Sequence, residues 1–258
     1  MASDLFKEEV KHYDKTFFTD LEDGAYKSAK KVLPVVNEAF HPASVLDVGC
    51  GVGYWLRVWK EDFNLDDLLG LEGAYVTEEL FKMDKKYLLS ADLKLPLDLN
   101  RRFDLVTTFE VAEHIPEDCA DVFVSNLVKA SDIVVFSAAI IGQLGTYHIN
   151  EQMPEYWAKK FLRHDYVPVD FIRPLIWNDK DIEYWYRQNS LVYIKKSRLA
   201  DFPKLQPVAE LTNPDFLLRI HPEKYFAYVD EANRLQTIKG FIKYKLYHLK
   251  LWFKSLGK

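Results

Sequence analysis

A doubly wound α/β fold, in which helices cover both faces of a mostly parallel sheet, is predicted by three features of this 258-residue chain. The stretch Val45-Leu-Asp-Val-Gly-Cys-Gly-Val-Gly53 is an apolar run that stops at alternate glycines, and residues 54–60 after it follow a helical pattern. Short apolar strands then alternate with helical stretches as far as Ala138, which is typical of parallel sheets. Acidic residues stand where strands end, the edge at which ligands bind in this architecture. These residues are Asp47, Glu72, Asp92 and Glu110.

The composition limits the class of protein. A chain that is 48% hydrophobic can bury a full core, and its formal net charge of −5 offers no basic surface for nucleic acid. Of its two cysteines, Cys50 lies inside the glycine loop, so we expect no structural disulfide and a reducing compartment. The first residues lack the apolar core of a signal peptide, and the longest apolar run, Ile133–Ile141, is too short to cross a membrane. We therefore expect a soluble cytoplasmic protein.

The spacing of apolar residues gives the order of elements. Residues 5–40 carry apolar side chains at helical intervals and predict one or two helices that end at Pro42. We divide the chain into an N-terminal helical lid at 1–43, a ligand-binding domain at 44–200 and a C-terminal helical extension at 201–258. The first five predicted strands are Ser44–Val48, Leu68–Glu72, Tyr87–Ser90, Phe103–Phe109 and Ile133–Ala138, and a helix to about Val128 precedes the fifth.

The glycine loop and Glu72 together predict a nucleoside site. Glycines allow a ligand to approach the main chain, and the unpaired amides at the start of the next helix would face that ligand. Glu72 ends the second strand about twenty residues after the loop. An acidic side chain in that position can accept hydrogen bonds from both hydroxyls of a ribose.

These residues resemble those of the class I S-adenosylmethionine-dependent methyltransferases over roughly residues 44–195. Val45-Leu-Asp-Val-Gly-Cys-Gly51 is similar to their first motif, Ala91-Asp-Leu93 to the segment at the adenine edge and Phe103-Asp-Leu-Val106 to their fourth strand. The resemblance implies S-adenosylmethionine as cofactor and a seven-stranded sheet whose last hairpin, from Asp165–Phe171 and Leu191–Lys195, is antiparallel. It implies donor contacts from Asp47, Gly49, Cys50, Gly51, Glu72, Gly73, Asp92, Leu93 and Glu110.

Later segments resemble a subgroup of these enzymes associated with glycan and polysaccharide biosynthesis, which implies a sugar hydroxyl as acceptor. The segments are Phe136-Ser-Ala-Ala139, Gly145-Thr-Tyr-His-Ile-Asn-Glu-Gln152, Tyr156-Trp157 and Trp185-Tyr-Arg-Gln-Asn189. Because aromatic rings stack on sugar C–H groups and amides bind hydroxyls, we expect Tyr186 and Asn189 to contact the acceptor, with Asn150. Gln152 is interpreted as a cap of the helix predicted over Glu155–Leu162. Ordinary core packing is the alternative for these aromatic residues.

A divalent metal site is predicted beside the donor. Glu110, Glu113 and His114 are spaced at i, i+3 and i+4, so they would project from one face if a helical turn follows the fourth strand. The pattern is similar to that of ubiquinone-pathway and small-RNA 2′-O-methyltransferases, which implies a bound ion completed by a later histidine, here His148. Magnesium or manganese is the expected ion, although two carboxylates with two imidazoles suit manganese, iron or zinc better than magnesium or calcium.

The alternative interpretation has no metal. His114 would then only shape the donor pocket, and His148 would be the general base, because an imidazole can accept a proton near pH 7. In both interpretations His148 belongs to the catalytic site.

The C-terminal segment is predicted to be a basic amphipathic helix. No acidic residue follows Glu231, and six lysines are interleaved with apolar residues at intervals of three or four. Such a helix can lie on an anionic membrane, which would place the protein at the inner face of the membrane, or it can pack on its own domain or on a partner subunit of a homodimer.

The leading hypothesis is therefore a methyltransferase that acts on a sugar hydroxyl of a polysaccharide or lipid-linked glycan. A methyltransferase for a small phenol or amine, and a non-catalytic scaffold that keeps the donor site, are the alternatives.

Overall fold

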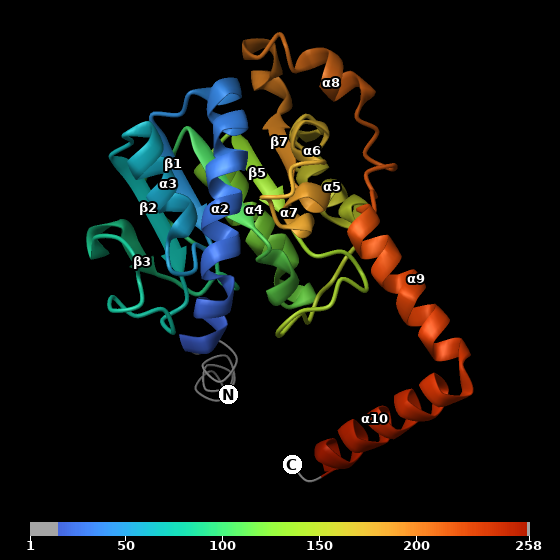
Figure 1. The fold of residues 1–258 in the computed structure, drawn as a ribbon. Helices are drawn as coiled ribbons and strands as arrows, with labels where there is room; N and C mark the ends of the chain where they lie inside the picture. The colour runs from blue at the N-terminus through green and yellow to red at the C-terminus, as the bar shows by residue number, and fades with distance from the viewer. Residues whose placement is uncertain (1–14, 257–258) are drawn as a thin grey trace. The chain divides into compact units, whose positions relative to one another are not determined.

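A seven-stranded sheet with strand order β3-β2-β1-β4-β5-β7-β6 forms the centre of the molecule, as predicted (Figure 1). The computed structural model describes the backbone of residues 15–256 and the side chains of residues 24–250 and 252. The strands are β1 (Ser44–Val48), β2 (Asp67–Glu72), β3 (Leu88–Ser90), β4 (Leu105–Phe109), β5 (Ile133–Ser137), β6 (Tyr166–Val169) and β7 (Leu191–Lys195).

The sheet is parallel except at one end. Strands β1 to β5 pair in parallel, whereas β7 runs antiparallel to both β5 and β6. The last hairpin is thus antiparallel, as the family resemblance implied. The carboxyl ends of β1, β2 and β4 meet at one edge, where Glu72 and Glu110 lie at or just after the strand ends.

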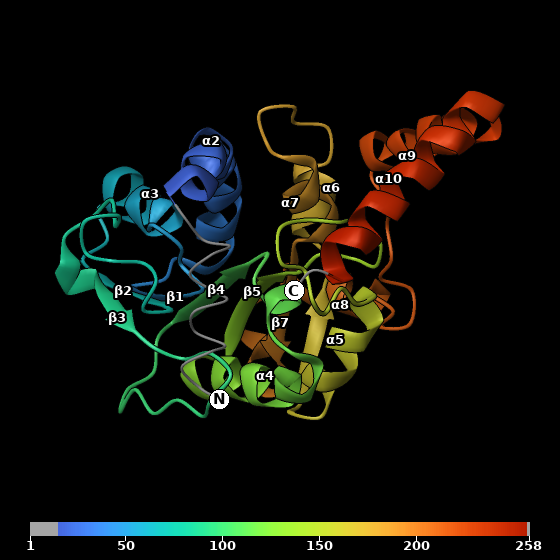
Figure 2. The same ribbon diagram turned by 90° about the horizontal axis from the view of Figure 1, so that it is seen from below.

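Helices cover both faces of the sheet and define two apolar cores (Figures 1 and 2). One face packs against α2, α3, α6 and α7, and the other packs against α4 and α5. Successive strand residues alternate between the cores: Val134 and Phe136 belong to one, Ile133 and Val135 to the other. The helices are α2 (Lys15–Phe40), α3 (Tyr54–Phe63), α4 (Ala120–Ala130), α5 (Pro154–Leu162), α6 (Ile172–Ile176), α7 (Tyr184–Asn189) and α8 (Gln206–Leu211), with 3₁₀ turns η1 (Lys85–Tyr87), η2 (Ala112–His114), η3 (Glu117–Cys119) and η4 (Lys196–Asp201).

Several predicted boundaries need correction. Strand β4 begins two residues later than predicted, and β6 is shorter at both ends. The helical turn expected after β4 is only the 3₁₀ turn η2, because Glu110 adopts a left-handed backbone conformation with φ of 54° and separates it from the strand. The part of the first predicted helix that precedes Lys15 lies outside the described residues.

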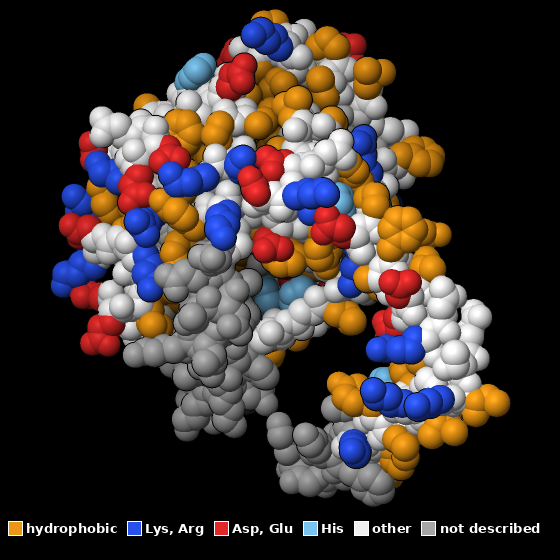
Figure 3. Space-filling model, in the orientation of Figure 1, with side chains coloured by type: hydrophobic (Ala, Val, Ile, Leu, Met, Phe, Trp, Pro, Cys, Tyr) orange, Lys and Arg blue, Asp and Glu red, His pale blue; other side chains and the backbone are white. Residues whose placement is uncertain are grey.

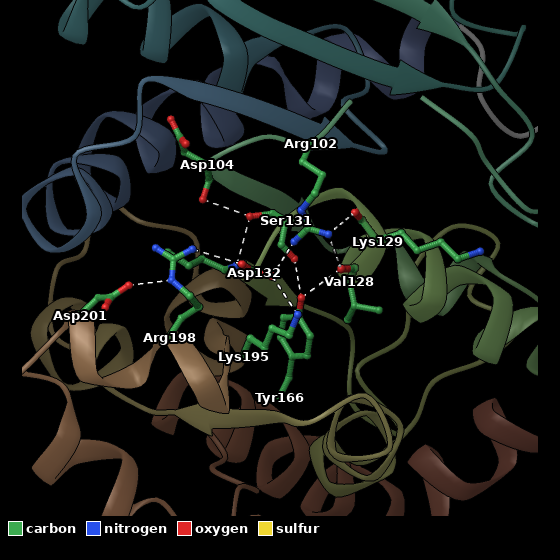
Figure 4. A network of polar contacts seen from close by, with 11 residues as sticks. Arg102, Asp104, Val128, Lys129, Ser131, Asp132, Tyr166, Lys195, Arg198 and Asp201 are labelled. Carbon is green, nitrogen blue, oxygen red and sulfur yellow. Dashed lines mark hydrogen bonds and ion pairs between the residues drawn. The ribbon is translucent and has the colours of Figure 1, made fainter. Parts of the chain in front are cut away.

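A charged network around Asp132 lies at the amino ends of the parallel strands, on the side of the sheet away from Glu72 and Glu110 (Figure 4). Its carboxylate accepts hydrogen bonds from Arg102 at 2.5 Å and Arg198 at 3.2 Å, and Lys195 lies 3.5 Å away. The Tyr166 hydroxyl donates to backbone carbonyls at the end of α4 at 2.6 and 3.0 Å. This cluster therefore joins β5, β6 and β7 and has a structural role.

A buried arginine ties α6 to the segments around it. Arg173 is 1% exposed and forms a bidentate pair with Asp170 at 2.7 and 2.8 Å. Its remaining nitrogen donates to the carbonyls of Gln188 and Leu217 at 3.2 and 2.8 Å. One guanidinium thus connects α6 and the nearby Asp170 to Gln188 and Leu217, which lie 15 and 44 positions after Arg173.

Substitution Arg173→Ala is expected to lower the free energy of unfolding by about 3–5 kcal/mol, because it leaves a buried carboxylate and two carbonyls without this donor. Urea unfolding of the purified protein measures the change. The control is Arg163→Ala, since Arg163 is exposed and pairs with exposed Asp121, and a loss below about 1 kcal/mol is expected. Equal losses for both variants would contradict the structural role of Arg173.

The described chain divides into two compact units after Arg219. Residues 201–219 belong to the first unit, where Leu217 is 1% exposed and its amide donates to Glu155. The second unit contains α9 (Pro222–Gln236) and α10 (Ile238–Leu256). No helix within the described residues is long and apolar enough to cross a membrane.

Candidate active site

The glycine loop after β1 has the backbone conformation that glycine allows. Gly49, Gly51 and Gly53 all have positive φ values. A Cβ atom on Gly49 would lie 2.4 Å from the Val111 side chain, so a larger residue cannot fit there. The amides of Gly49 and Cys50 both donate to the Leu71 carbonyl, which fixes the loop against β2.

Glu72 holds the glycine loop from the neighbouring strand. Its Oε2 accepts a hydrogen bond from the Gly51 amide at 2.7 Å, and its Oε1 accepts from the Gly73 amide at 2.8 Å and the Tyr75 hydroxyl at 2.5 Å. The side chain is 5% exposed yet borders the cavity. Asp92, from the loop after β3, borders the same cavity and accepts from the Lys94 amide at 3.0 Å.

Asp47 lies beneath the loop and does not border the cavity. It is 2% exposed, its Oδ1 accepts from the Thr107 hydroxyl at 2.7 Å, and its Oδ2 has no hydrogen-bond partner among the described residues. Burial therefore raises the pKa of the Asp47 carboxyl to about 7, and the charge of Glu72 adds to the effect.

The raised pKa of Asp47 predicts a pH effect on stability. In the unfolded chain this carboxyl ionises near its ordinary pKa of 3.8, so the folded state binds more protons between that value and about 7. The stabilising contribution of the protonated Asp47 carboxyl is thus fully present below pH 3.8 and is lost as the pH rises through about 7. We expect Asp47→Asn to gain stability relative to the natural protein as the pH rises through this window, measured by urea unfolding. A difference in stability between the two proteins that does not change with pH would contradict the raised pKa of Asp47.

Glu113, His114 and His148 form a compact group in the lining of the cavity that also contains the glycine loop. One possible ligand atom from each residue lies within 4.8 Å of those of the other two. His148 Nε2 is 3.9 Å from Glu113 Oε1, and the two imidazole rings are edge to face with centroids 4.9 Å apart. Glu113 is fully buried, and neither of its carboxylate oxygens has a hydrogen-bond partner among the described residues.

Backbone hydrogen bonds bring these residues together from two separate segments. The amides of Ile149 and Asn150 donate to the Glu113 carbonyl at 3.0 and 2.9 Å. The Asn150 side chain donates to the Ile115 carbonyl at 3.0 Å and is 4% exposed. Asn150, expected to contact the acceptor, thus joins the segment after β4 to the loop after β5 and does not border the cavity.

Both imidazoles are oriented by their Nδ1 atoms. His114 Nδ1 lies 3.1 Å from the Tyr147 carbonyl, and His148 Nδ1 lies 2.8 Å from the Glu151 carboxylate. Since each of these partners accepts a hydrogen bond, we assign the proton to Nδ1 and a lone pair to Nε2 in both rings. Burial lowers the pKa of His114 to about 4, so this ring is neutral near pH 7.

Glu151 also shapes the loop that carries His148. Its two oxygens accept hydrogen bonds from the Gly142 and Leu144 amides, each at 2.7 Å. Leu144 and Tyr147 have positive φ values, a conformation that costs energy outside glycine and is common at functional sites.

Glu110 stands apart from this group. Gln143 donates to its carboxylate at 2.7 Å and Asn189 at 3.1 and 3.3 Å, and burial raises its pKa. Burial likewise raises the pKa of Glu113 well above the ordinary value, and the nearby charge of Glu110 raises it further. Asn189 is 5% exposed and lies behind Glu110, outside the residues that line the cavity.

A cavity of about 640 Å³ connects the glycine loop with the histidines, large enough for a ligand of nucleoside size. One wall is aromatic: Trp55 stacks on Phe109 with centroids 3.8 Å apart, and Tyr186 packs edge to face against both. The predicted site residues that line it are Gly49, Cys50, Gly51, Glu72, Gly73, Asp92, Leu93, Glu110, Glu113, His114, His148 and Tyr186.

Some residues of the site were not predicted. Glu151 and Gln143 hold His148 and Glu110, and Trp55 forms part of the wall. A carboxylate three residues from a candidate metal-binding histidine is a signal that could have identified Glu151. Gln152 is not a helix cap, since it donates to the Asn150 side chain and α5 begins after Met153 without a side-chain cap.

A protein-family profile described as “Methyltransferase domain” matches residues 21–127. The match includes most of α2, the glycine loop, Glu72 and the segment with Glu113 and His114. Together with the strand order, it shows that the protein has a class I methyltransferase domain and is an S-adenosylmethionine-dependent methyltransferase. No curated protein sequence matches the chain.

Solved structures with related topology include three methyltransferases. The plantazolicin methyltransferase BpumL, bound to a monoazolic analogue and SAH, is 18% identical, with 75% of this chain and 91% of that chain covered and a TM-score of 0.48. The methyltransferase domain of bacterial CtHen1 is 16% identical, with 66% and 97% covered and a TM-score of 0.47. CalS10, an amino pentose methyltransferase from Micromonospora echinaspora, is 18% identical, with 51% and 59% covered and a TM-score of 0.41. These structural similarities do not identify the acceptor of this protein.

Proposed function

We propose that this methyltransferase transfers the methyl group of S-adenosylmethionine to a sugar hydroxyl of a polysaccharide or lipid-linked glycan, with the help of a divalent cation. The observation that carries the proposal is the group of Glu113, His114 and His148, which lines the same cavity as the glycine loop. Two imidazoles and one carboxylate are a set that first-row divalent ions such as manganese accept, and magnesium is the less suitable ion.

The structure of this chain alone supports a cation site at these three residues. The Glu113 carboxylate is buried with no hydrogen-bond partner among the described residues, which is costly unless a positive charge or a proton compensates. The Nδ1 atom of each imidazole is in a hydrogen bond with a carbonyl or a carboxylate, which fixes the orientation of the ring. Each ring could then bind the cation through its Nε2 atom. The ion, when bound, would lower the pKa of the acceptor hydroxyl and balance its developing negative charge.

The chain's own residues would position the reaction. The glycine loop and Glu72 would hold the donor, and the aromatic wall of Trp55, Phe109 and Tyr186 would exclude water. The donor, when bound, would supply the methyl group, and the acceptor oxygen would form its bond to the methyl carbon as the bond from that carbon to sulfur breaks. His148 Nε2, whose partner atom Nδ1 is held by Glu151, lies where it can orient the acceptor or accept its proton.

Metal removal tests the role of the cation. After dialysis against a chelator, we expect the protein to bind S-adenosylmethionine in a calorimeter with unchanged affinity but to lose methyl transfer, and added manganese to restore it. Full turnover without a divalent ion would contradict this part of the proposal.

An acceptor panel tests the substrate class. The protein is incubated with radiolabelled donor and with simple glycosides, catechols or primary amines, and we expect label only on the glycosides. Transfer to catechols alone would instead support the small-phenol alternative, which the aromatic wall could also serve.

A further inference from the structure

Helix α10 carries two distinct surfaces along its length. At about 100° per residue, five apolar residues fall within an arc of about 100°. They are Ile238, Phe241, Ile242, Leu249 and Trp252. All five side chains are between 48% and 82% exposed, so α9, the other helix of this unit, does not cover them.

A row of lysines borders this apolar face. Lys239, Lys243 and Lys250 fall within an arc of about 40° along one flank of the helix. No acidic residue lies between Ile238 and Lys258, whereas the whole chain has a formal net charge of −5. In Figure 3 the described side chains of α10 are accordingly coloured orange, blue and pale blue, without red. The helix is therefore a basic, apolar element attached to an acidic protein.

We infer that α10 docks on the surface of an anionic lipid bilayer. Charge complementarity selects this partner, because the lysine flank would lie at the level of lipid phosphates while the apolar face enters the acyl boundary. The acidic remainder of the chain has no comparable attraction to such a surface. The inference concerns a different surface from the methyl-transfer site and does not depend on the identity of the acceptor.

Lys245 distinguishes a bilayer from a second copy of the chain as the partner. It falls in the middle of the apolar arc, with Nζ 5.5 Å from the centre of the Phe241 ring. A dimer seam would bury this ammonium with no carboxylate on α10 to pair with it, which is costly. At a bilayer its alkyl stem lies along the apolar face and its ammonium reaches the headgroups.

The test is flotation of the full-length protein with vesicles of phosphatidylcholine alone or with about one third phosphatidylglycerol. We expect binding only to the anionic vesicles, weakening as salt increases. Ile242→Glu should weaken binding at least about tenfold. Tyr247→Glu, which adds the same charge on the opposite side of the helix, should weaken it by less than about threefold.

The lysine flank has its own matched control. Replacement of Lys239, Lys243 and Lys250 by glutamine should weaken binding to anionic vesicles about a hundredfold. Replacement by glutamine of three exposed lysines of the first unit should leave binding to anionic vesicles unchanged. These lysines are Lys180, Lys196 and Lys204.

Three outcomes would overturn the inference. They are absence of binding to anionic vesicles, equal losses for Ile242→Glu and Tyr247→Glu, and a fall in the solution mass of the protein with Ile242→Glu, which would show that the face covers a second copy. The donor affinity of each variant, measured by calorimetry, confirms that the protein is folded. Since no step of the test measures turnover, failure of the proposed acceptor would not affect it.

Discussion

Replacement of His148 by alanine is expected to lower the kcat of methyl transfer by at least about a thousandfold, with the dissociation constant of S-adenosylmethionine changed by less than about threefold. The imidazole lies 3.9 Å from the Glu113 carboxylate and lines the same cavity as the glycine loop, so its loss removes a candidate ligand and a candidate base together. Steady-state kinetics with the true acceptor and calorimetry with the donor measure the two quantities. Full turnover by the variant would contradict both roles.

Two further measurements separate the roles of His148. If the imidazole holds a cation, the variant binds manganese about ten- to a hundredfold more weakly, as followed by metal analysis after equilibrium dialysis. If it acts only as a base, metal binding is unchanged and free imidazole in solution restores part of the activity. His164→Ala is the control, because His164 is an exposed histidine outside the cavity and its loss should leave kcat unchanged.

Glu151→Gln provides an intermediate case. The carboxylate accepts from the His148 imidazole and from two loop amides, and glutamine can replace only part of these contacts. We therefore expect kcat to fall by about ten- to a hundredfold with donor affinity preserved. A loss equal to that of His148→Ala would indicate that the loop has collapsed, which limited proteolysis of the variant would reveal.

The part of the site that was predictable from sequence is the part built by local rules. Alternate glycines after an apolar strand require a particular turn, and an acidic residue at the end of the next strand necessarily lies beside that turn in a parallel sheet. For this reason Glu72 and Gly51 were placed together by spacing alone, and the structure joins them by a 2.7 Å hydrogen bond.

The rest of the site depends on contacts that spacing does not encode. Glu110 was expected to share a helical face with Glu113, but its left-handed φ of 54° breaks that periodicity and its carboxylate is taken by Gln143 and Asn189. The pairing of residues 113–115 with 148–150 relies on backbone hydrogen bonds across more than thirty positions, for which side-chain type gives no signal. Only the family resemblance pointed to His148.

Substitution Glu72→Gln is expected to weaken S-adenosylmethionine binding about thirty- to three-hundredfold. Two effects add. The amide is a poorer acceptor than the carboxylate for ribose hydroxyls, since hydrogen bonds to charged groups contribute about 1.5–3 kcal/mol each. In addition, its NH₂ group would face one of the two backbone amides, of Gly51 or Gly73, that now donate to Glu72, which loosens the glycine loop. Calorimetry measures the affinity.

Two variants test whether this effect is specific to Glu72. Glu78→Gln removes an exposed carboxylate a few residues away and should leave donor affinity unchanged. Tyr75→Phe removes the hydroxyl that donates to Glu72 Oε1 at 2.5 Å, where a ribose hydroxyl would compete for the same oxygen. Donor binding by this variant should be unchanged or up to about fivefold tighter, because the carboxylate no longer has that partner to displace. A donor affinity for Glu72→Gln within threefold of the natural protein would contradict a ribose contact.

The kinetics of Glu72→Gln should differ in kind from those of His148→Ala. A contact made equally to bound donor and to the transition state changes KM and leaves kcat intact. Because the ribose lies away from the methyl group, the Glu72 variant should recover nearly full kcat at saturating donor. The His148 variant should not recover at any donor concentration, since we propose that its imidazole acts on the reacting hydroxyl. If both variants lost kcat equally, Glu72 would do more than hold the ribose. Its contacts with the glycine loop would then also be needed to align the donor methyl group.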